Sequence, residues 1–392
     1  MKGRDLTAPG LAAEQPVSWP ERFRDWRSRT VARPEFQRWA AAFLPTRWIV
    51  RKQARELFDL VAGFVYTQVL QACVRLKLFD LLADGPMPLD ALASRLGLSV
   101  EAAQRLLSAA ASLDLVERRR GDRYALGRLG APMVGNGGIA SMVEHHATLY
   151  ADLADPVALL RGDGRPPAMA GYWPYAAHDG QATARLSPEQ VAEYSTLMSM
   201  TQPMVAAEVL DAYSFQRHRC LLDIGGGEGT FLRAVSQRAP HLQLKLFDLP
   251  AVAARAHVRF EAWGLGDRAE ALGGDFFVDE LPRGADIVSM IRVAFDHPDE
   301  RVLALLRAVR RALPDDGTLL LAEPMAGAPG AAAMGDAYFG FYLLAMGRGR
   351  PRSAADFAAL LREAGFDGGR SVPTLLPLQT GIVVARCVAR KP

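Results

Sequence analysis

Alternating glycines and an aspartate at a fixed distance carry the clearest chemical signal in this chain. Residues 221–232 read LLDIGGGEGTFL, so β-favouring apolar residues lead into Gly225, Gly227 and Gly229 before an apolar pattern resumes. This order predicts a strand, a tight loop and a helix. Glycine lets a ligand lie closer to the main chain than a Cβ atom would permit. The next apolar run ends at Asp248, an acid that can hold the ribose hydroxyls of a nucleoside.

The glycine spacing separates two kinds of nucleotide ligand. A dinucleotide loop needs a third small residue three positions after its second glycine, whereas Thr230 occupies that position here. The acid does not discriminate, because nicotinamide-binding proteins also carry one about 20 residues further on. The glycine pattern resembles motif I of the methyltransferases that use S-adenosylmethionine (SAM). SAM is therefore the expected ligand, and a nicotinamide oxidoreductase is a less favoured alternative.

Size, charge and cysteine content limit the class of the protein. The chain has 392 residues, more than one typical domain, so two domains are expected. The formal net charge of +3 is too small to indicate a nucleic-acid-binding protein. Cys73, Cys220 and Cys387 form no closely spaced pair, so we expect neither a disulfide framework nor a metal site. A reducing, cytoplasmic compartment fits this cysteine pattern.

The N-terminal arm, residues 1–55, is basic and rich in aromatic residues. Between residues 21 and 55 there are ten Arg or Lys against three Asp or Glu. Phe36, Trp39 and Phe43 are spaced to share one face of a helix. Such a helix can make a peripheral contact with the inner membrane, or it can pack on the body or on a second subunit. No run of 18 or more apolar residues is present, so no membrane-spanning segment is expected.

After the arm, the sequence predicts a helical domain that contains a winged helix. Dense apolar residues at 56–82 predict a buried helix or helix pair. A helix that stops at Gly97 precedes a helix that begins at Ser99, and a hairpin with its turn at 121–122 follows. A DNA-reading second helix would present several basic or amide side chains, but Arg105 is its single cation. We therefore expect no nucleic-acid binding.

Strands and helices alternate in the last half of the chain, after a predicted helix at 188–213. This alternation predicts an α/β fold with a doubly wound, parallel, Rossmann-like sheet. Strands are expected at 221–224, 244–248, up to 273, and at 286–293, 318–323 and 381–388. Helices are expected at 251–263, 299–313 and 354–365.

Four motifs in order resemble those of the family 2 O-methyltransferases, the plant caffeate and animal acetylserotonin type. They are residues 247–250 (FDLP), residues 274–277 (GDFF), Arg292 and residues 349–366. The resemblance covers about residue 56 to the end of the chain. It implies a homodimer in which a winged-helix dimerisation domain precedes a SAM-binding domain. The expected domains are the arm at 1–55, a dimerisation and substrate-lining domain at 56–187, and a SAM-binding domain at 188–392.

The same resemblance implies which residues bind SAM. Asp248 would hold the ribose, and Leu249 would lie against the adenine ring. Asp275 and Phe276 belong to the loop that meets the adenine amino group, and Arg292 matches an arginine that contacts SAM in animal members. The expected set is completed by Asp223, Gly225 and Gly227.

Three further features resemble the bacterial carotenoid branch of the family. They are the basic aromatic arm, the adjacent histidines 145 and 146 with residues 150–156, and residues 292–298. The resemblance implies methyl transfer to the tertiary hydroxyl of an acyclic hydroxycarotenoid. An O- or C-methyltransferase that acts on a polyketide or a tetrapyrrole is the alternative. A SAM-sensing DNA-binding regulator is a third and less favoured hypothesis.

The base of the plant and animal enzymes is missing from its usual position. Those members carry His before Asp, whereas this chain carries Phe295 before Asp296. Phenylalanine cannot accept a proton, yet an alcohol must lose one. Glu323 ends a strand where family members keep an acid. Neighbouring helical residues diverge by about 100°, so one of the adjacent histidines should face the acceptor pocket. The candidates for a replacement base are His146 or His145 first, then His297, with Asp296 beside it.

Overall fold

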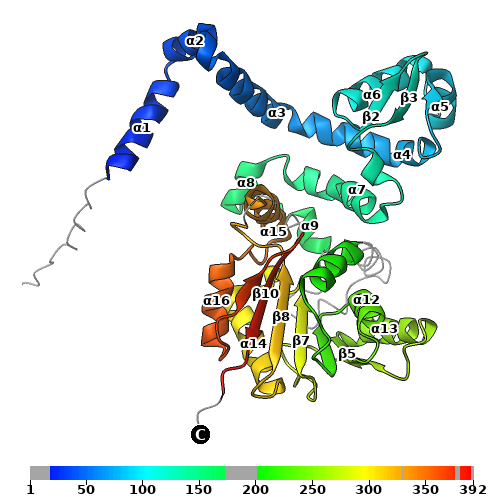
Figure 1. Cartoon of the computed structure of the whole chain (residues 1–392), viewed down its shortest axis with the longest axis vertical. Coiled ribbons are helices and arrows are strands. Elements are labelled where there is room, and N and C mark those ends of the chain that lie inside the picture. The colour runs from blue at the N-terminus through cyan, green and yellow to red at the C-terminus, as the bar shows by residue number, and fades with distance from the viewer. Residues whose placement is uncertain (1–17, 164, 173–200, 329, 376–379, 390–392) are drawn as a thin grey trace, which may run out of the picture. The chain divides into compact units, whose positions relative to one another are not determined.

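The computed structural model describes residues 18–163, 165–172, 201–328, 330–375 and 380–389. The chain divides into two compact units, Met1–Ala72 and Cys73–Pro392 (Figure 1). The helices of the first unit are α1 (Trp19–Val31), α2 (Pro34–Ala42) and α3 (Leu44–Arg75), of which α3 continues into the second unit.

Helices α1 and α2 start where the sequence supplies start signals. Ser18 and Glu21 form a capping box at α1, and Pro34 opens α2, where its missing N–H costs no hydrogen bond. The ring centroids of Phe36 and Trp39 lie 5.5 Å apart, and those of Trp39 and Phe43 lie 5.1 Å apart. The predicted aromatic face is therefore confirmed.

Helix α3 differs from two expectations. The predicted burial of residues 56–82 is wrong for the first part of this stretch, because Leu57, Leu60 and Phe64 are exposed in the single chain. The helix becomes buried only near its end, from Gln71 onward. Length and composition also make α3 a candidate to cross a membrane, contrary to the prediction, although core helices of soluble proteins pass the same test. A dense run of apolar residues predicts that a helix packs against another apolar surface. It does not show whether that surface belongs to the same chain or to a partner.

The second unit begins with the predicted winged helix. Gly97 ends one helix in the left-handed conformation, and the Ser99 hydroxyl accepts a hydrogen bond from Ala102 N at 3.1 Å. Gly121 and Asp122 both have positive φ in the hairpin turn. The strands form an antiparallel sheet in the order β1-β3-β2. The elements are α4 (Leu78–Leu81), β1 (Met87–Pro88), α5 (Leu89–Leu96), α6 (Val100–Ser112), β2 (Val116–Arg119) and β3 (Arg123–Leu126).

Further helices connect the winged helix to the α/β domain. They are a 3₁₀ turn at Ala131–Met133, α7 (Gly137–Asp152), α8 (Pro156–Arg161) and α9 (Ala168–Tyr172). Residues 201–212 are helical, as predicted, whereas the earlier part of the helix expected at 188–213 lies outside the described residues.

In the described part of the chain, the larger sheet has seven strands in the order β6-β5-β4-β7-β8-β10-β9. The strands are β4 (Cys220–Ile224), β5 (Gln243–Asp248), β6 (Ala269–Gly273), β7 (Ile287–Ile291), β8 (Thr318–Glu323), β9 (Arg370–Val372) and β10 (Gly381–Arg386). The helices are α12 (Thr230–Arg238), α13 (Pro250–Ala262), α14 (Asp299–Ala312), α15 (Gly340–Met346) and α16 (Ala354–Glu363), with a 3₁₀ turn at Ala294–Asp296 and a π-helix at Ala333–Phe339.

The prediction of a parallel sheet is wrong at one edge. Strands β4 to β8 pair in parallel, but β10 runs antiparallel to both β8 and β9. A parallel connection needs a crossover of a dozen or more residues, and fewer residues than that separate β9 from β10. The short strand β9 gave no apolar pattern, so the sequence analysis missed it.

Both faces of the sheet are covered by helices. Side chains from α12, α13 and residues 201–212 pack with one set of strand residues, and side chains from α14 and α16 pack with the alternate set. Figure 1 shows α12 and α13 on one side of the sheet and α14 and α16 on the other. This arrangement places the carboxyl ends of β4, β5, β6 and β7 along one edge, where open α/β sheets bind their ligands.

Candidate active site

The glycine loop after β4 needs glycine for reasons that the structure makes explicit. Gly225, Gly227 and Gly229 have φ values of +66°, +60° and +81°, which residues with a Cβ atom rarely adopt. A Cβ atom on Gly225 would also lie 2.7 Å from Val293 Cγ2, and one on Gly229 would collide with the ring of Phe260. A Cβ atom on Gly227 would meet nothing within 4 Å, so open space lies beside the main chain there.

Asp248 ties this loop to the neighbouring strand. Its Oδ2 accepts a hydrogen bond from Gly227 N at 2.8 Å, and its Oδ1 accepts one from Leu249 N at 2.7 Å. Burial raises the pKa of Asp248 to about 6, and the two amide hydrogen bonds oppose that rise. Each carboxylate oxygen keeps a second lone pair, so the group can still accept from a ligand hydroxyl.

Asp223 lies under the glycine loop with half of its carboxyl group unsatisfied. Its Oδ1 accepts a hydrogen bond from Ser289 Oγ at 2.6 Å, whereas Oδ2 has no partner among the described residues. A Cβ atom on Gly226 would lie 2.5 Å from this Oδ2. Burial raises the pKa of Asp223 to about 7. A buried acceptor without a partner is rare in folded proteins, so this oxygen can take a hydrogen bond from a bound ligand.

The adenine loop predicted at 274–277 is joined to the same site. Gly273 pairs with Asp248 across β6 and β5, and Gly274 N donates to Asp248 O at 2.9 Å. Asp275 Oδ1 accepts a hydrogen bond from Phe277 N at 2.8 Å, which closes the turn that presents Phe276. The strand order thus brings the loop after β6 beside Asp248, the acid predicted to bind the ribose.

Arg292 follows β7 and has a strained backbone, with φ at +57°. Its Nη1 donates a hydrogen bond to Thr201 Oγ1 at 2.8 Å, and its N donates to Ala322 O at 2.8 Å. The side chain therefore links the end of β7 to the helix at 201–212. The available residues fit SAM, because an open glycine loop, a hydroxyl-binding acid and an unpartnered buried carboxyl oxygen lie at one sheet edge.

Glu323, at the end of β8, holds the loop that carries Phe295. Its carboxylate is fully buried and accepts hydrogen bonds from Val293 N at 3.0 Å, Ala294 N at 2.8 Å and Phe295 N at 3.4 Å. Burial raises the pKa of Glu323 to about 7, and these amides oppose the rise. The sequence indicated an acid at this strand end but not its partners, which lie about 30 residues earlier in the chain.

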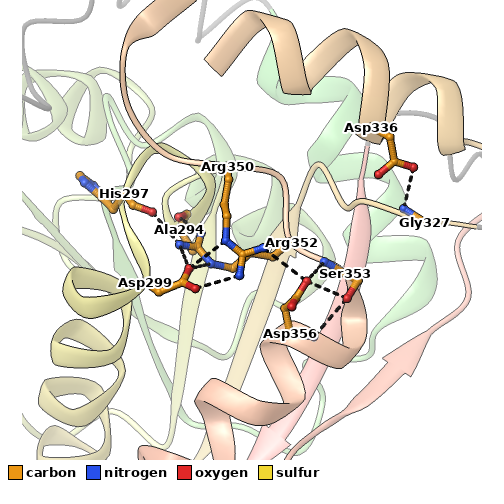
Figure 2. A network of polar contacts seen from close by, with 9 residues as sticks. All are labelled: Ala294, His297, Asp299, Gly327, Asp336, Arg350, Arg352, Ser353 and Asp356. Carbon is orange, nitrogen blue, oxygen red and sulfur yellow. Dashed lines mark hydrogen bonds and ion pairs between the residues drawn. The ribbon is translucent and has the colours of Figure 1, made fainter. Parts of the chain in front are cut away.

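The second anchor of this loop is Arg352, whose side chain is fully buried. Its Nη1 donates to Ala294 O at 2.6 Å and its Nη2 donates to His297 O at 2.7 Å. Its Nε and Nη2 also bind Asp299 Oδ1, at 2.9 and 2.6 Å, beside Arg350 (Figure 2). The loop is therefore clamped by an acid on one strand and by an arginine near α16.

Asp296 and His297 lie within the clamped loop. Asp296 is buried, and its Oδ1 has no hydrogen-bond partner among the described residues. Burial and the charge of Glu323 raise the pKa of Asp296 well above its usual range, and Arg292 opposes the rise. The His297 ring lies edge-on to Phe277, at 4.9 Å between centroids, and to Phe276, at 6.0 Å. The His297 ring therefore packs against the loop at 274–277.

The side chain at the usual base position is surrounded by apolar groups. Phe295 packs in a cluster with Leu149, Tyr342 and Met346, and its ring lies edge-on to Phe339 at 6.1 Å. The structure therefore provides no proton acceptor at position 295.

The adjacent histidines on α7 each meet a tyrosine of the π-helix and α15 segment. His145 Nε2 lies 3.0 Å from Tyr342 Oη, and His146 Nε2 lies 2.7 Å from Tyr338 Oη. Burial, with help from His146, lowers the pKa of His145 to about 4, and burial also lowers the pKa of His146. Both rings are therefore neutral at pH 7. Both histidines therefore contact this segment, and which of them faces the acceptor stays a prediction.

The sequence places Tyr342 among the residues that could line the acceptor site, but it does not predict that either tyrosine pairs with a histidine. Tyr338 and Tyr342 are four residues apart and their rings stack at 5.9 Å, so they share one helical face. That spacing indicates that the two tyrosines share one helical face. Only the fold shows that the histidines of α7 contact this face. Tyr338 also contacts Phe339 at 4.9 Å, which connects the histidine–tyrosine pairs to the cluster around Phe295.

Comparison with known proteins identifies the family of this chain. The family model of the O-methyltransferase domain matches residues 150–367, and that of the O-methyltransferase dimerisation domain matches residues 58–135. The demethylspheroidene O-methyltransferase of Cereibacter sphaeroides is 45% identical over 339 residues, which cover 86% of this chain and 88% of that protein. Its namesake from Rhodobacter capsulatus is 40% identical over 338 residues, covering 86% and 83%.

A solved structure with the reaction product of SAM bound has the same fold. The calicheamicin biosynthesis methyltransferase CalO1, bound to S-adenosylhomocysteine (SAH), matches with a TM-score of 0.64 at 26% identity, over 86% of this chain and 98% of that one. The predicted fold class, the cofactor and the enzyme class are confirmed, and the dimerisation domain supports the predicted homodimer. The chain therefore belongs to the family 2 O-methyltransferases, which transfer a methyl group from SAM.

Proposed function

We propose that this enzyme methylates the tertiary hydroxyl of an acyclic hydroxycarotenoid in carotenoid biosynthesis. The observation that carries the proposal is the long match to two demethylspheroidene O-methyltransferases, at 45% and 40% identity over 86% of the chain.

When bound, SAM supplies a methyl group that is activated by its sulfonium sulfur. We assign its binding to the residues at the sheet edge, with Asp248 on the ribose hydroxyls and Leu249 and Phe276 at the adenine ring. Asp275 holds the adenine loop, and Arg292 positions the end of β7. We assign the methionine portion of SAM to the space beside Asp223, Gly225 and Gly227.

Proton removal is assigned to a histidine–tyrosine pair, His146 with Tyr338 or His145 with Tyr342. A neutral imidazole carries a lone pair on one ring nitrogen. When the tyrosine hydroxyl donates to Nε2, its oxygen can accept the alcohol proton while its own proton moves to the imidazole. The relay leaves an alkoxide, whose oxygen takes the methyl group, and a positively charged imidazolium. Asp296 is a less favoured candidate because its carboxyl group is buried, and burial and the charge of Glu323 raise its pKa well above the usual range.

Single replacement of His146 or His145 by alanine separates these assignments. The histidine that takes the proton is expected to lower kcat by about 10²-fold or more, with the dissociation constant of SAH unchanged. Phenylalanine at the partner tyrosine should lower kcat in parallel, since it keeps the ring and removes the hydroxyl. Replacement of the exposed His257 by alanine is the control. If kcat survives in both histidine variants, the base lies elsewhere, and His297 is the next candidate.

The acceptor is tested directly with purified enzyme and SAM. A hydroxycarotenoid with a tertiary hydroxyl should gain one methyl group by mass spectrometry, while phenolic polyketides and tetrapyrroles should not. The reverse result would replace this proposal by the alternative acceptors. The DNA-binding alternative is disfavoured by α6, where Arg105 pairs with Glu101 at 3.4 Å, and a gel shift tests it.

We further propose that the enzyme acts in the cytoplasm, binds no nucleic acid, and contacts the inner membrane peripherally. The supporting observations are the exposed aromatic rings of the arm and the apolar character of the proposed acceptor.

A further inference from the structure

The helices of the arm expose aromatic rings in continuous rows. Along α1, the ring centroids of Trp19 and Phe23 lie 5.8 Å apart, and those of Phe23 and Trp26 lie 5.7 Å apart. A second row of rings lies along α2, where Trp39 packs against Phe36 and Phe43, and Trp48 lies in the first turns of α3. Trp19 is 76% exposed, Trp26 60% and Trp39 54%. Helix α1 buries no residue at all, so the described chain does not cover these rings.

Charge is arranged around the rings in a particular order. At 3.6 residues per turn, the row on α1 is flanked by Arg22 and Arg27, whereas Glu21 and Asp25 lie on the opposite side. An aromatic stripe with cations at its borders and acids away from it is typical of a helix at a lipid–water interface. The rings lie at the headgroup level, and the arginines reach phosphate groups.

The charge also argues against contact between the arms of two copies of the chain. Residues 21–55 carry ten Arg or Lys against three Asp or Glu, so two such surfaces would repel each other. Cores of protein interfaces are depleted of charged residues. The match to the dimerisation domain begins at residue 58, after this surface, and the exposed apolar residues Leu57, Leu60 and Phe64 of α3 lie at its start.

We propose that the aromatic face of the arm, formed by Trp19, Phe23, Trp26, Trp39 and Trp48 with the neighbouring arginines, docks on an anionic lipid bilayer. The helices lie in the plane of the interface and do not cross it. Docking would bring the enzyme to an acceptor dissolved in that bilayer. Only this role of the docking rests on the proposed function. Attraction between clustered cations and anionic lipid adds to the burial of the rings.

The test is co-sedimentation of the full-length protein with vesicles of phosphatidylcholine alone or mixed with phosphatidylglycerol. Binding should require the anionic lipid and should fall as salt rises from about 0.05 to about 0.5 M. The triple variant Trp19→Ser, Trp26→Ser, Trp39→Ser should bind on the order of tenfold more weakly. The control variant Val258→Ser, Val278→Ser removes exposed apolar side chains elsewhere and should bind as the unchanged protein does.

Other outcomes would overturn the proposal. Equal binding of the triple variant would show that the aromatic face is not the contact, and retention after alkaline carbonate extraction would show that α3 spans the bilayer. Conversion of a dimer to a monomer by the triple variant would assign the face to a second copy. An unchanged dissociation constant for SAH establishes that the variant is folded. Vesicle binding needs no acceptor, so a failed carotenoid assay with intact vesicle binding refutes only the proposed function.

Discussion

Replacement of Asp248 by alanine is expected to weaken SAM binding by about 10²-fold or more. The carboxylate accepts from Gly227 N and Leu249 N, and it is the group assigned to the ribose hydroxyls. Hydrogen bonds to a charged group contribute about 1.5 to 3 kcal/mol each, so losing two of them to the ligand accounts for that factor. Isothermal titration with SAH measures the effect without any acceptor.

Two companion variants sharpen this prediction. Asp248→Asn keeps the shape and one acceptor oxygen but presents an amide nitrogen to a donor, so an intermediate loss is expected. Asp84→Ala removes an exposed acid that is distant from Asp248 in the sequence, and it should leave the dissociation constant for SAH unchanged. Binding of SAH by Asp248→Ala within about threefold of the unchanged protein would contradict the assignment of Asp248.

Replacement of Arg352 by methionine is expected to lower the free energy of unfolding by about 3 kcal/mol. Removing one partner of a buried charged network leaves the others unpaired. The variant would strand the carbonyl oxygens of Ala294 and His297 in a buried region and free Asp299. The loop that carries Phe295 would lose one of its two anchors, so kcat should fall as well. Urea unfolding followed by fluorescence measures the loss of stability.

Arg350→Ala is the matched control, because Arg350 binds the same Asp299 carboxylate from a half-exposed position. Exposed ion pairs contribute about 0.2 to 1 kcal/mol, so its effect should be small. Arg352→Lys retains the charge but cannot reproduce the planar fork, and an intermediate loss is expected. Equal stability of Arg352→Met and Arg350→Ala would mean that the clamp does not hold the loop.

Features set by neighbouring residues could be predicted from the sequence. The turn at Gly225 to Gly229, the Ser99 cap and the stop at Gly97 each depend on the conformational range or hydrogen bonding of a few adjacent residues. The juxtaposition of the loop with Asp248 was also predictable, because adjacent parallel strands end at the same sheet edge.

Features set by distant pairings could not be predicted. The direction of β10 depends on the short strand β9, which has no pattern of its own. The three amides held by Glu323 and the tyrosines that meet His145 and His146 are brought in by chain folding over about 30 and nearly 200 residues. The dense apolar residues along α3 predicted burial, but in the single chain much of that helix is exposed.

The antiparallel edge has a consequence for aggregation. Strand β9 is three residues long and exposes Arg370 and Ser371, so it offers an incoming strand few free backbone groups and an unfavourable charge. At the opposite edge, β6 exposes Glu270 and ends at Gly273. A sheet with such edges resists strand-by-strand growth into fibrils. That property matters most for a protein concentrated on a surface, where neighbouring copies meet often.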